Sequence, residues 1–225
     1  MFVHGAGGGG WEWAVWARMF GAHGHAVLAP DLRPGPDGLA ATSIHDYAAQ
    51  VREWIAAARC AVPGRRLVLV GASLGGLLAL MNRTRADAVV LLNPMPPEGL
   101  PGPADDIDIV RWGRDTSLAG TRCALPDADD LATLHAFRRW RDESGLAIRQ
   151  ARAGIACAEA TTPVLVMASA GDTHVPAGRS AALAASLHAS LLRLPGSHVG
   201  PLLGRQAGAV AAQAVEWLNA HAPRR

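Results

Sequence analysis

Short apolar runs alternate with amphipathic segments along most of the 225-residue chain. Five runs have the length and composition of buried strands, namely Ala26–Ala29, Leu67–Val70, Ala88–Leu92, Val164–Ala168 and Leu191–Leu194. The segments between these runs carry apolar residues at helical spacing. Strands that alternate with helices indicate βα units, so the pattern predicts an α/β fold with a mainly parallel sheet flanked by helices.

The clearest helical pattern covers Ile44 to Arg59. It starts at Ser43-x-x-Asp46, which resembles a capping box, and its apolar side chains recur every three to four residues. Similar stripes run from Trp13 to Phe20 and from Val210 to Leu218. We expect the tryptophans in these stripes to belong to the core and not to a ligand platform.

The alternation stops between Pro94 and Thr161. Five prolines open this stretch, and the acidic run containing Asp105, Asp106 and Asp108 follows them, which we interpret as a solvated edge. Two helices are expected, over Asp129–Arg141 and Gly145–Ala158, and no strand. The sequence therefore predicts one domain over residues 1–225, with a small helical insertion at residues 95–160 above one face.

A serine flanked by glycines carries the strongest chemical signal. The stretch Gly71-Ala72-Ser73-Leu74-Gly75 lies between an apolar strand and a helical segment. This arrangement is typical of a nucleophile elbow, in which a sharp turn exposes the serine hydroxyl at the top of the sheet. The pentapeptide alone is weak, since its residues are common in this chain, and its position between strand and helix strengthens it.

A nucleophilic serine needs a base, and the base needs an orienting acid. His198 follows the last apolar strand, and Asp172 follows the strand ending near Ala168. Sites in open α/β sheets lie beyond the carboxyl ends of the strands. His174 is also just past a strand, but His198 keeps the chain order Ser, Asp, His. The plainer alternatives are a loop histidine and a turn or helix-capping aspartate.

The glycine-rich stretch His4–Gly10 can turn backbone N–H groups toward an oxyanion, with the N–H of Leu74 as a second donor. A phosphate-binding loop would need Gly-Lys-Ser/Thr, which is absent. Asp31, about 20 residues further on, keeps a dinucleotide-binding alternative open.

Composition narrows the classes further. The net charge is +2, all 21 basic residues are arginines, and the clusters Arg65-Arg66 and Arg138-Arg139-x-Arg141 are interpreted as solvated faces, so we expect no nucleic-acid partner. No apolar run is as long as a membrane-spanning helix, which needs about 18 consecutive apolar residues. No signal peptide is visible. Cys60, Cys123 and Cys157 are widely spaced, which suggests reduced thiols, a cytoplasmic protein and no metal site.

Five landmarks in order resemble the α/β-hydrolase superfamily: His4-Gly5-Ala6, Pro30-Asp31-Leu32-Arg33, Gly71–Gly76, Asp172–Pro176 and Gly196-Ser197-His198. The opening is most similar to the small esterase and hydroxynitrile-lyase branch. The resemblance implies Ser73 as nucleophile, His198 as base and Asp172 as its orienting acid. It also implies Ala6 and Leu74 as oxyanion N–H donors, and a cap in place of the insertion.

The chain departs from that family at its start and beside the histidine. Only a stub, Met1–Val3, stands where further strands are usual, so the fold would be shortened at its N-terminus. The natural chain is expected to extend upstream, and the stub to lie between Ala26–Ala29 and Leu67–Val70. The lyases of this branch use a lysine next to the catalytic histidine, whereas Val199 stands here and lysine is absent.

These observations predict a serine hydrolase for a small to medium uncharged carboxylic ester, or a thioester, without metal or organic cofactor. Trp11, Met95, Leu100 and Trp112 are the expected pocket lining. A small-molecule ester is the expected partner of a monomer or homodimer, with no membrane. A lyase or C–C bond hydrolase, and a non-catalytic receptor on a hydrolase frame, remain alternatives.

Overall fold

The computed structural model describes residues 1–102 and 106–221, and a parallel sheet of five strands forms its centre. The strands stand in the order β1 (Phe2–Val3), β2 (Val68–Ala72), β3 (Ala88–Leu92), β6 (Val164–Ser169) and β7 (Ser190–Leu194). Every neighbouring pair is parallel. The predicted α/β fold with a mainly parallel sheet is confirmed, and four of the five expected strands are present.

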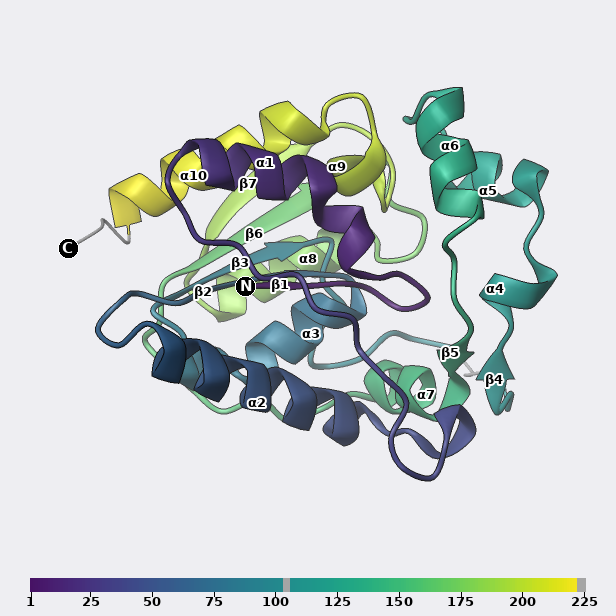
Figure 1. The fold of residues 1–225 in the computed structure, drawn as a ribbon, viewed down its shortest axis with the longest axis horizontal. Coiled ribbons are helices and arrows are strands. Elements are labelled where there is room, and N and C mark those ends of the chain that lie inside the picture. Colours follow the sequence, from purple (N-terminus) through teal and green to yellow (C-terminus); the bar gives the residue numbers. More distant parts are fainter. Residues whose placement is uncertain (103–105, 222–225) are drawn as a thin grey trace.

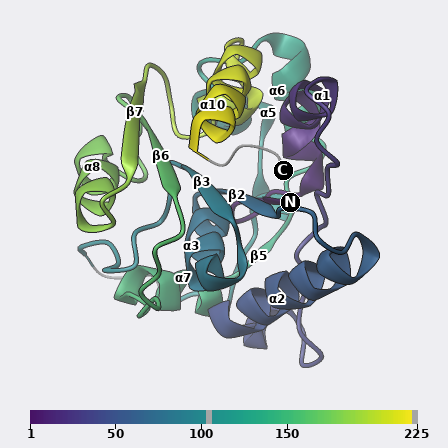
Figure 2. The same ribbon diagram turned by 90° about the vertical axis from the view of Figure 1, so that its left-hand side faces the viewer.

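Helices cover both faces of the sheet (Figures 1 and 2). One face carries α1 (Ala14–Ala22), α9 (Gly200–Leu203) and α10 (Ala207–His221), and the other carries α2 (Ile44–Ala61), α3 (Leu74–Met81), α7 (Gly145–Ala153) and α8 (Ala177–Ser186). Short 3-10 turns occur at Gly10–Trp13, Leu39–Ala41 and Arg83–Arg85. Successive strand side chains point to opposite faces, so β3 sends Val89 and Leu91 to the α3 side and Val90 to the α1 side.

The amphipathic patterns form the helices they predict. At the start of α2 the Ser43 hydroxyl accepts a hydrogen bond from the Asp46 N–H at 3.2 Å, and the Asp46 carboxylate accepts one from the Ser43 N–H at 2.8 Å. This is the expected capping box. Trp13 and Trp16 are fully buried, and Trp13 stacks on Phe2 at 4.8 Å between ring centroids. Both tryptophans are core residues, as expected.

The expected strand at Ala26–Ala29 is wrong, because this segment has no strand structure. Phe2 nevertheless lies between Ala26–Ala29 and the strand β2, as expected for the Met1–Val3 stub. It pairs with Val70 on one side, and its N–H donates to the Leu28 carbonyl at 2.7 Å on the other. β1 has only two residues, so a single hydrogen bond reaches the segment and no ladder forms. Half of the Leu28 surface remains exposed.

Between β3 and β6 the chain leaves the sheet and builds a separate layer, seen at the right of Figure 1 and called the cap below. It contains β4 (Ile109–Val110), α4 (Trp112–Asp115), α5 (Leu118–Ala124), α6 (Asp130–Phe137) and β5 (Glu143–Ser144). The expectation of no strand here is wrong, because β4 and β5 pair in antiparallel orientation. The two expected helices are present but end earlier. Of the acidic run, Asp106 and Asp108 are exposed, and Asp105 lies outside the described residues.

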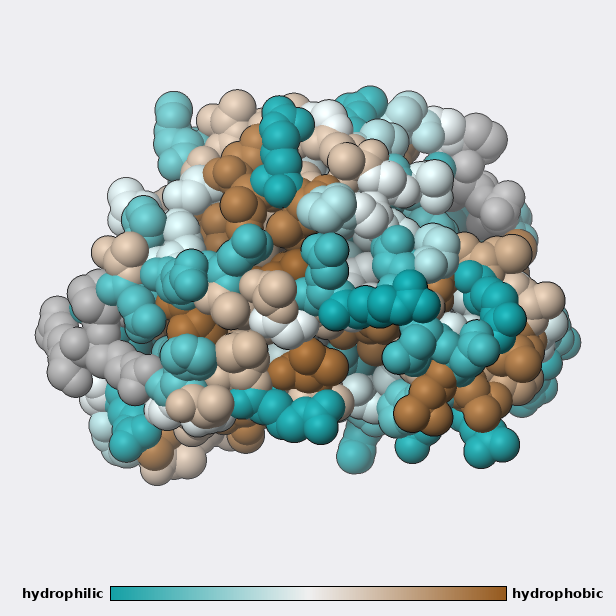
Figure 3. All heavy atoms as spheres, turned by 90° about the horizontal axis from the view of Figure 1, so that it is seen from above, coloured by the Kyte–Doolittle hydropathy of each residue, from teal (hydrophilic) through white to brown (hydrophobic). Residues whose placement is uncertain are grey.

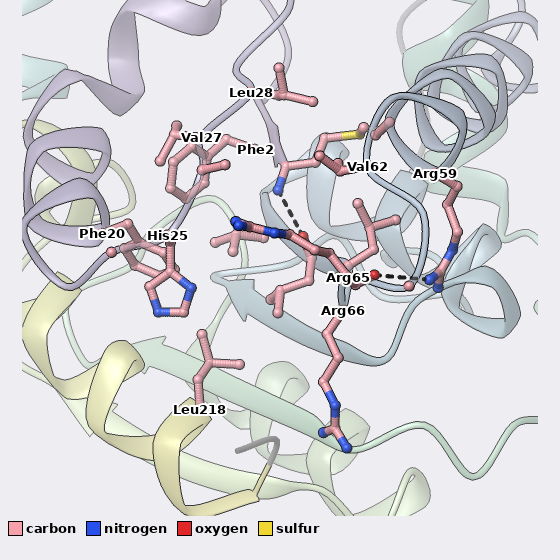
Figure 4. A pocket seen from close by; sticks show the side chains of 18 residues that line it. Phe2, Phe20, His25, Val27, Leu28, Arg59, Val62, Arg65, Arg66 and Leu218 are labelled. Atoms are coloured by element: carbon pink, nitrogen blue, oxygen red, sulfur yellow. Dashed lines mark hydrogen bonds between the residues drawn. The ribbon is translucent and has the colours of Figure 1, made fainter. Parts of the chain in front are cut away.

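A cavity of about 410 Å³ lies at the amino ends of the strands, away from Ser73 (Figure 4). Phe2, His25 and Leu28 line it together with the arginines that follow α2. The Met1 amine donates to the Val68 carbonyl at 2.8 Å, and burial lowers the pKa of this amine to about 5. The cavity is on the opposite edge of the sheet from the candidate chemistry.

The surface mixes polar and apolar side chains, as seen from the α1 and α10 side in Figure 3. Six large apolar residues of the described chain are well exposed, and four of them belong to the cap: Ile107, Trp112, Leu118 and Leu131. No helix in the described residues is both long and apolar enough to cross a membrane. The three cysteines are free thiols.

Candidate active site

Ser73 occupies a strained turn between β2 and α3. Its φ of 51° and ψ of −119° lie outside the regions that L-residues favour. The Ser73 N–H donates to the Leu92 carbonyl at 3.0 Å, which ties the turn to the end of β3. A Cβ at Gly75 would collide with the carbonyl oxygens of Val3 and His4, so this close approach requires glycine. The backbone thus has the geometry of a nucleophile elbow.

Asp172 and His198 meet beyond the ends of β6 and β7. The Asp172 Oδ2 atom lies 2.6 Å from His198 Nδ1, and only 1 % of the Asp172 side chain is exposed. The other oxygen of Asp172 accepts the backbone N–H groups of His174 at 2.8 Å and Val175 at 2.9 Å. The carboxylate is therefore fixed in place. A carboxylate facing Nδ1 favours the imidazole tautomer with its proton on Nδ1, in which the Nε2 lone pair is free.

In the described chain the Ser73 hydroxyl makes no hydrogen bond to His198. Catalytic hydrogen bonds in ligand-free sites are often long and tighten only with substrate. Two contacts at the end of β3 nevertheless connect the two residues. Leu92 accepts the Ser73 N–H, and the neighbouring Asn93 donates from Nδ2 to the His198 carbonyl at 2.7 Å.

Asn93 was not found by the sequence reasoning. Its backbone has a φ of 43°. Its side chain also bonds Ser169 twice: Nδ2 donates to the Ser169 Oγ at 2.9 Å, and Oδ1 accepts the Ser169 N–H at 2.7 Å. It thereby joins β3, β6 and the histidine loop. The available signal was its position directly after an apolar run, the same signal that pointed to Asp172.

The glycine-rich loop lies beside Ser73, and its last four N–H groups already have acceptors within the protein. The N–H groups of Gly7, Gly8, Gly9 and Gly10 donate respectively to Glu143, Gly5, Glu12 and Asp31. In the described chain, the N–H groups of Ala6 and Leu74 have no such protein acceptor. A Cβ built on Gly5 would lie 3.3 Å from the Ser73 Cβ, so the loop runs directly against the elbow. The N–H groups of Ala6 and Leu74, the expected oxyanion donors, thus have no competing acceptor in the described residues.

Two cap residues hold this loop, and neither was identified from sequence. The Arg141 N–H donates to the Gly7 carbonyl at 2.8 Å, and its Nε donates to the Gly8 carbonyl at 2.7 Å. The Glu143 carboxylate accepts the Gly7 N–H at 3.0 Å and the Tyr47 hydroxyl. The interpretation of Arg141 as part of a solvated face is wrong, because its guanidinium is committed to the loop.

Burial controls the charge of two side chains that contact the glycine-rich loop, those of His4 and Glu12. Desolvation lowers the pKa of His4 to about 4, so its imidazole is neutral near pH 7. His4 Nε2 accepts the Leu32 N–H at 2.9 Å, which places the ring proton on Nδ1, where it faces the Gly5 carbonyl at 2.8 Å. Desolvation also raises the pKa of Glu12 to about 8. His4 and Glu12 thus shape the loop from buried positions.

The four expected lining residues occupy different places. The Met95 N–H donates to the Ser73 carbonyl at 2.9 Å, and the Trp112 ring lies against Gly7. Trp11 instead packs edge-on against His135 and Trp140 of the cap at 5.6 and 5.5 Å between centroids. The Leu100 N–H donates to the Arg152 carbonyl, near the end of α7. Met95 and Trp112 are thus beside the site loops, while Trp11 and Leu100 contact the cap and α7.

The histidine loop is also held from the cap, by a residue that sequence reasoning missed. The Asp127 Oδ2 atom accepts the Ser197 N–H at 2.5 Å, and the Asp127 carbonyl accepts the Arg205 N–H at 3.1 Å. A Cβ at Gly200 would collide with the Asp127 carboxylate, which packs directly on this loop. Both the glycine-rich loop and the histidine loop are therefore fastened to the cap.

Comparison with known proteins gives the family. A model described as "Alpha/beta hydrolase family" matches residues 1–213. The chain belongs to this family. A probable esterase of Oryza sativa subsp. indica, PIR7A, is 37 % identical over 105 residues, which are 44 % of this chain and 40 % of the rice protein. The alignment thus spans less than half the length of that relative.

Solved α/β hydrolases share the whole fold. A variant of polyneuridine aldehyde esterase superimposes with a TM-score of 0.73 at 17 % identity, covering 96 % of this chain and 97 % of the other. A methylesterase from Arabidopsis gives 0.72 at 19 % identity, with 96 % and 98 % covered. At these identities the likeness establishes the fold. It agrees with the resemblance to the α/β-hydrolase superfamily, which the family match confirms.

Proposed function

We propose that this α/β hydrolase is a serine esterase that cleaves a small to medium uncharged carboxylic ester, or a thioester, through an acyl-enzyme on Ser73. The observation that carries the proposal is the 2.6 Å bond between Asp172 and His198 at the sheet edge that also carries the strained Ser73 elbow. The partial likeness to a probable rice esterase supports ester hydrolysis in general.

Each group has one role in the proposed reaction. His198 Nε2 takes the Ser73 proton as the hydroxyl attacks the ester carbonyl, and Asp172 stabilises the imidazolium that forms. The Ala6 and Leu74 N–H groups bind the oxyanion. His198 then gives its proton to the departing alcohol. Water hydrolyses the acyl-enzyme in the second half, again with His198 as base.

The surroundings of the site favour an uncharged acyl group. The guanidinium of Arg141, the cation nearest the glycine-rich loop, is already bonded to Gly8 and to the Leu32 carbonyl. The Trp112 ring presents apolar surface beside the loop, and Met95 follows the elbow, to which its N–H is bonded. Buried apolar area is the main attraction such a site offers, so size and shape of the acyl group would decide affinity.

The bond cleaved is the first prediction to test. The protein is expected to hydrolyse p-nitrophenyl acetate and butyrate, and to release no cyanide from mandelonitrile above background, because no lysine stands beside His198. Spectrophotometric release of p-nitrophenol and a cyanide assay on the same preparation separate the two outcomes. Cyanide release without ester hydrolysis would favour the lyase alternative, and absence of both would favour a receptor.

A second prediction concerns Asp127, which positions the histidine loop. Asp127→Ala leaves the Ser197 N–H without its acceptor, and a hydrogen bond to a charged group contributes about 1.5–3 kcal/mol. We expect kcat/KM for p-nitrophenyl butyrate to fall by about tenfold or more. Asp127→Asn should restore most of it, because its amide oxygen accepts the same bond. Gly200→Ala should lower the rate in the wild type, where the new methyl collides with Asp127.

A double-mutant cycle makes the Asp127 test specific. In Asp127→Ala the space beside Gly200 is open, so the added methyl should cost little there. Asp129→Ala is the matched control, because Asp129 caps α6 through the Ala132 N–H at 2.8 Å and its side chain makes no hydrogen bond to the histidine loop in the described residues. Independent, multiplicative effects of Asp127→Ala and Gly200→Ala would contradict the positioning role.

A further inference from the structure

A third ligating side chain stands beside the Asp172–His198 pair. The His174 ring lies 5.0 Å from the His198 ring between centroids, tilted by 35°. One ligand atom from each of Asp172, His174 and His198 can be chosen so that all three lie within 4.8 Å of one another. His174 is exposed, and in the described residues its ring forms no hydrogen bond, so the ring can turn. The proposed esterase mechanism gives it no role.

Two imidazoles and one carboxylate form a donor set suited to Zn²⁺ and similar divalent transition metals. A tetrahedral ion with bonds of about 2.0–2.1 Å needs ligand atoms about 3.3 Å apart. Asp172 is fixed by two backbone N–H groups and can keep them through Oδ1 while Oδ2 binds metal. The Asp172 Oδ2 and His198 Nδ1 atoms, now 2.6 Å apart, must move apart to this spacing, which the His198 ring edge, unbonded in the described residues, permits. The exposed His174 side chain rotates toward the pair, and water can fill the fourth position.

We propose that Asp172, His174 and His198 form a binding site for Zn²⁺ that reversibly switches off the esterase. The regulatory part of this inference rests on the proposed function, whereas the binding itself does not. Metal on His198 Nδ1 displaces the proton that now faces Asp172, and the neutral ring keeps that proton on Nε2. Nε2 then has no lone pair for the Ser73 proton. The metal therefore inhibits by exchanging the tautomer of the base, without touching Ser73.

Metal binding is measured first in Ser73→Ala, which keeps all three ligands and has no turnover. Calorimetry with ZnCl₂ is expected to give one site per chain, and Co²⁺ bound there should show the visible absorption of a tetrahedral complex. The double variant with Ser73→Ala and His174→Ala should bind Zn²⁺ at least tenfold more weakly than Ser73→Ala alone. His45→Ala, which removes another exposed histidine on α2, is the control and should bind as before. Equal binding with and without His174 would place the metal elsewhere, for example on an exposed cysteine, and overturn the site.

Inhibition is then measured in the active protein. Zn²⁺ should abolish p-nitrophenyl butyrate hydrolysis and EDTA should restore it, while His174→Ala keeps its activity without metal and needs at least tenfold more Zn²⁺ for half inhibition. Binding at the three ligands without inhibition would overturn the tautomer switch but leave the site. Because the calorimetry needs no turnover, an inactive protein would count against the proposed esterase and not against the metal site.

Discussion

Ser73→Ala is expected to lower kcat for ester hydrolysis by about 10⁶-fold, the loss seen when the nucleophile of a comparable triad is removed. The change should leave the fold intact. In the described residues the Ser73 hydroxyl has no hydrogen-bond partner, so its removal leaves no buried group unsatisfied. Alanine also meets the same backbone strain at a φ of 51° as serine does. The melting temperature should therefore stay within a few degrees of the wild type.

Labelling identifies the nucleophile independently of the substrate chosen. A fluorophosphonate probe should modify the wild type at Ser73, as read by mass spectrometry of the labelled peptide, and should not modify Ser73→Ala. Ser186→Ala removes a hydroxyl that bonds only its own helix, to the Leu183 carbonyl at 2.9 Å, and serves as the matched control. Labelling that persists in Ser73→Ala would mean that another serine is the nucleophile.

The sequence predicts a helix or strand correctly wherever a local pattern of apolar residues is enough to determine it. The run Ala88–Leu92 is buried on both faces and gives β3 with the predicted bounds. The segment Ala26–Ala29 has a similar composition but forms no strand, because the partner strand β1 offers only two residues. Pairing depends on the partner's length, and that information does not lie in the segment itself. The two-residue strands of the cap are likewise too short to produce a periodic signal.

The site shows the same division. Ser73, Asp172 and His198 each follow an apolar run, so their common sheet edge could be inferred from the parallel topology. The role of Arg141 could not be inferred, because its partner Gly8 is 133 positions away in sequence. The cluster Arg138–Arg141 also has the composition of a solvated surface. The cap brings Arg141 against the glycine-rich loop, and this contact takes its guanidinium out of the surface environment that the local sequence indicates. Residues that position others through such long-range contacts carry no local signature.

Asp172→Asn is expected to lower kcat by about 10⁴-fold with little loss of stability. The asparagine Oδ1 can still accept the N–H groups of His174 and Val175, so the loop after β6 keeps its bonds. The amide that replaces Oδ2 is a donor, and it faces His198 Nδ1 at the position of the present 2.6 Å contact. Two donors cannot share that contact, so Nδ1 must become the acceptor.

The ring proton then moves to Nε2, and the base has no lone pair for the Ser73 hydroxyl. Stopped-flow measurement of the acylation step should therefore show the loss before any product is released, and fluorophosphonate labelling of Ser73 should slow in proportion. Asp87→Asn is the matched control, since Asp87 is a half-buried carboxylate that pairs with Arg59 at 3.0 Å and accepts the Leu67 N–H at 2.7 Å, and the asparagine amide oxygen can still accept that N–H. Near-normal acylation in Asp172→Asn would show that another acid orients His198, and the exposed Glu98 beyond β3 would be the first to replace. If the acylation rate falls in Asp172→Asn and not in Asp87→Asn, the reaction depends on the His198 tautomer that Asp172 holds.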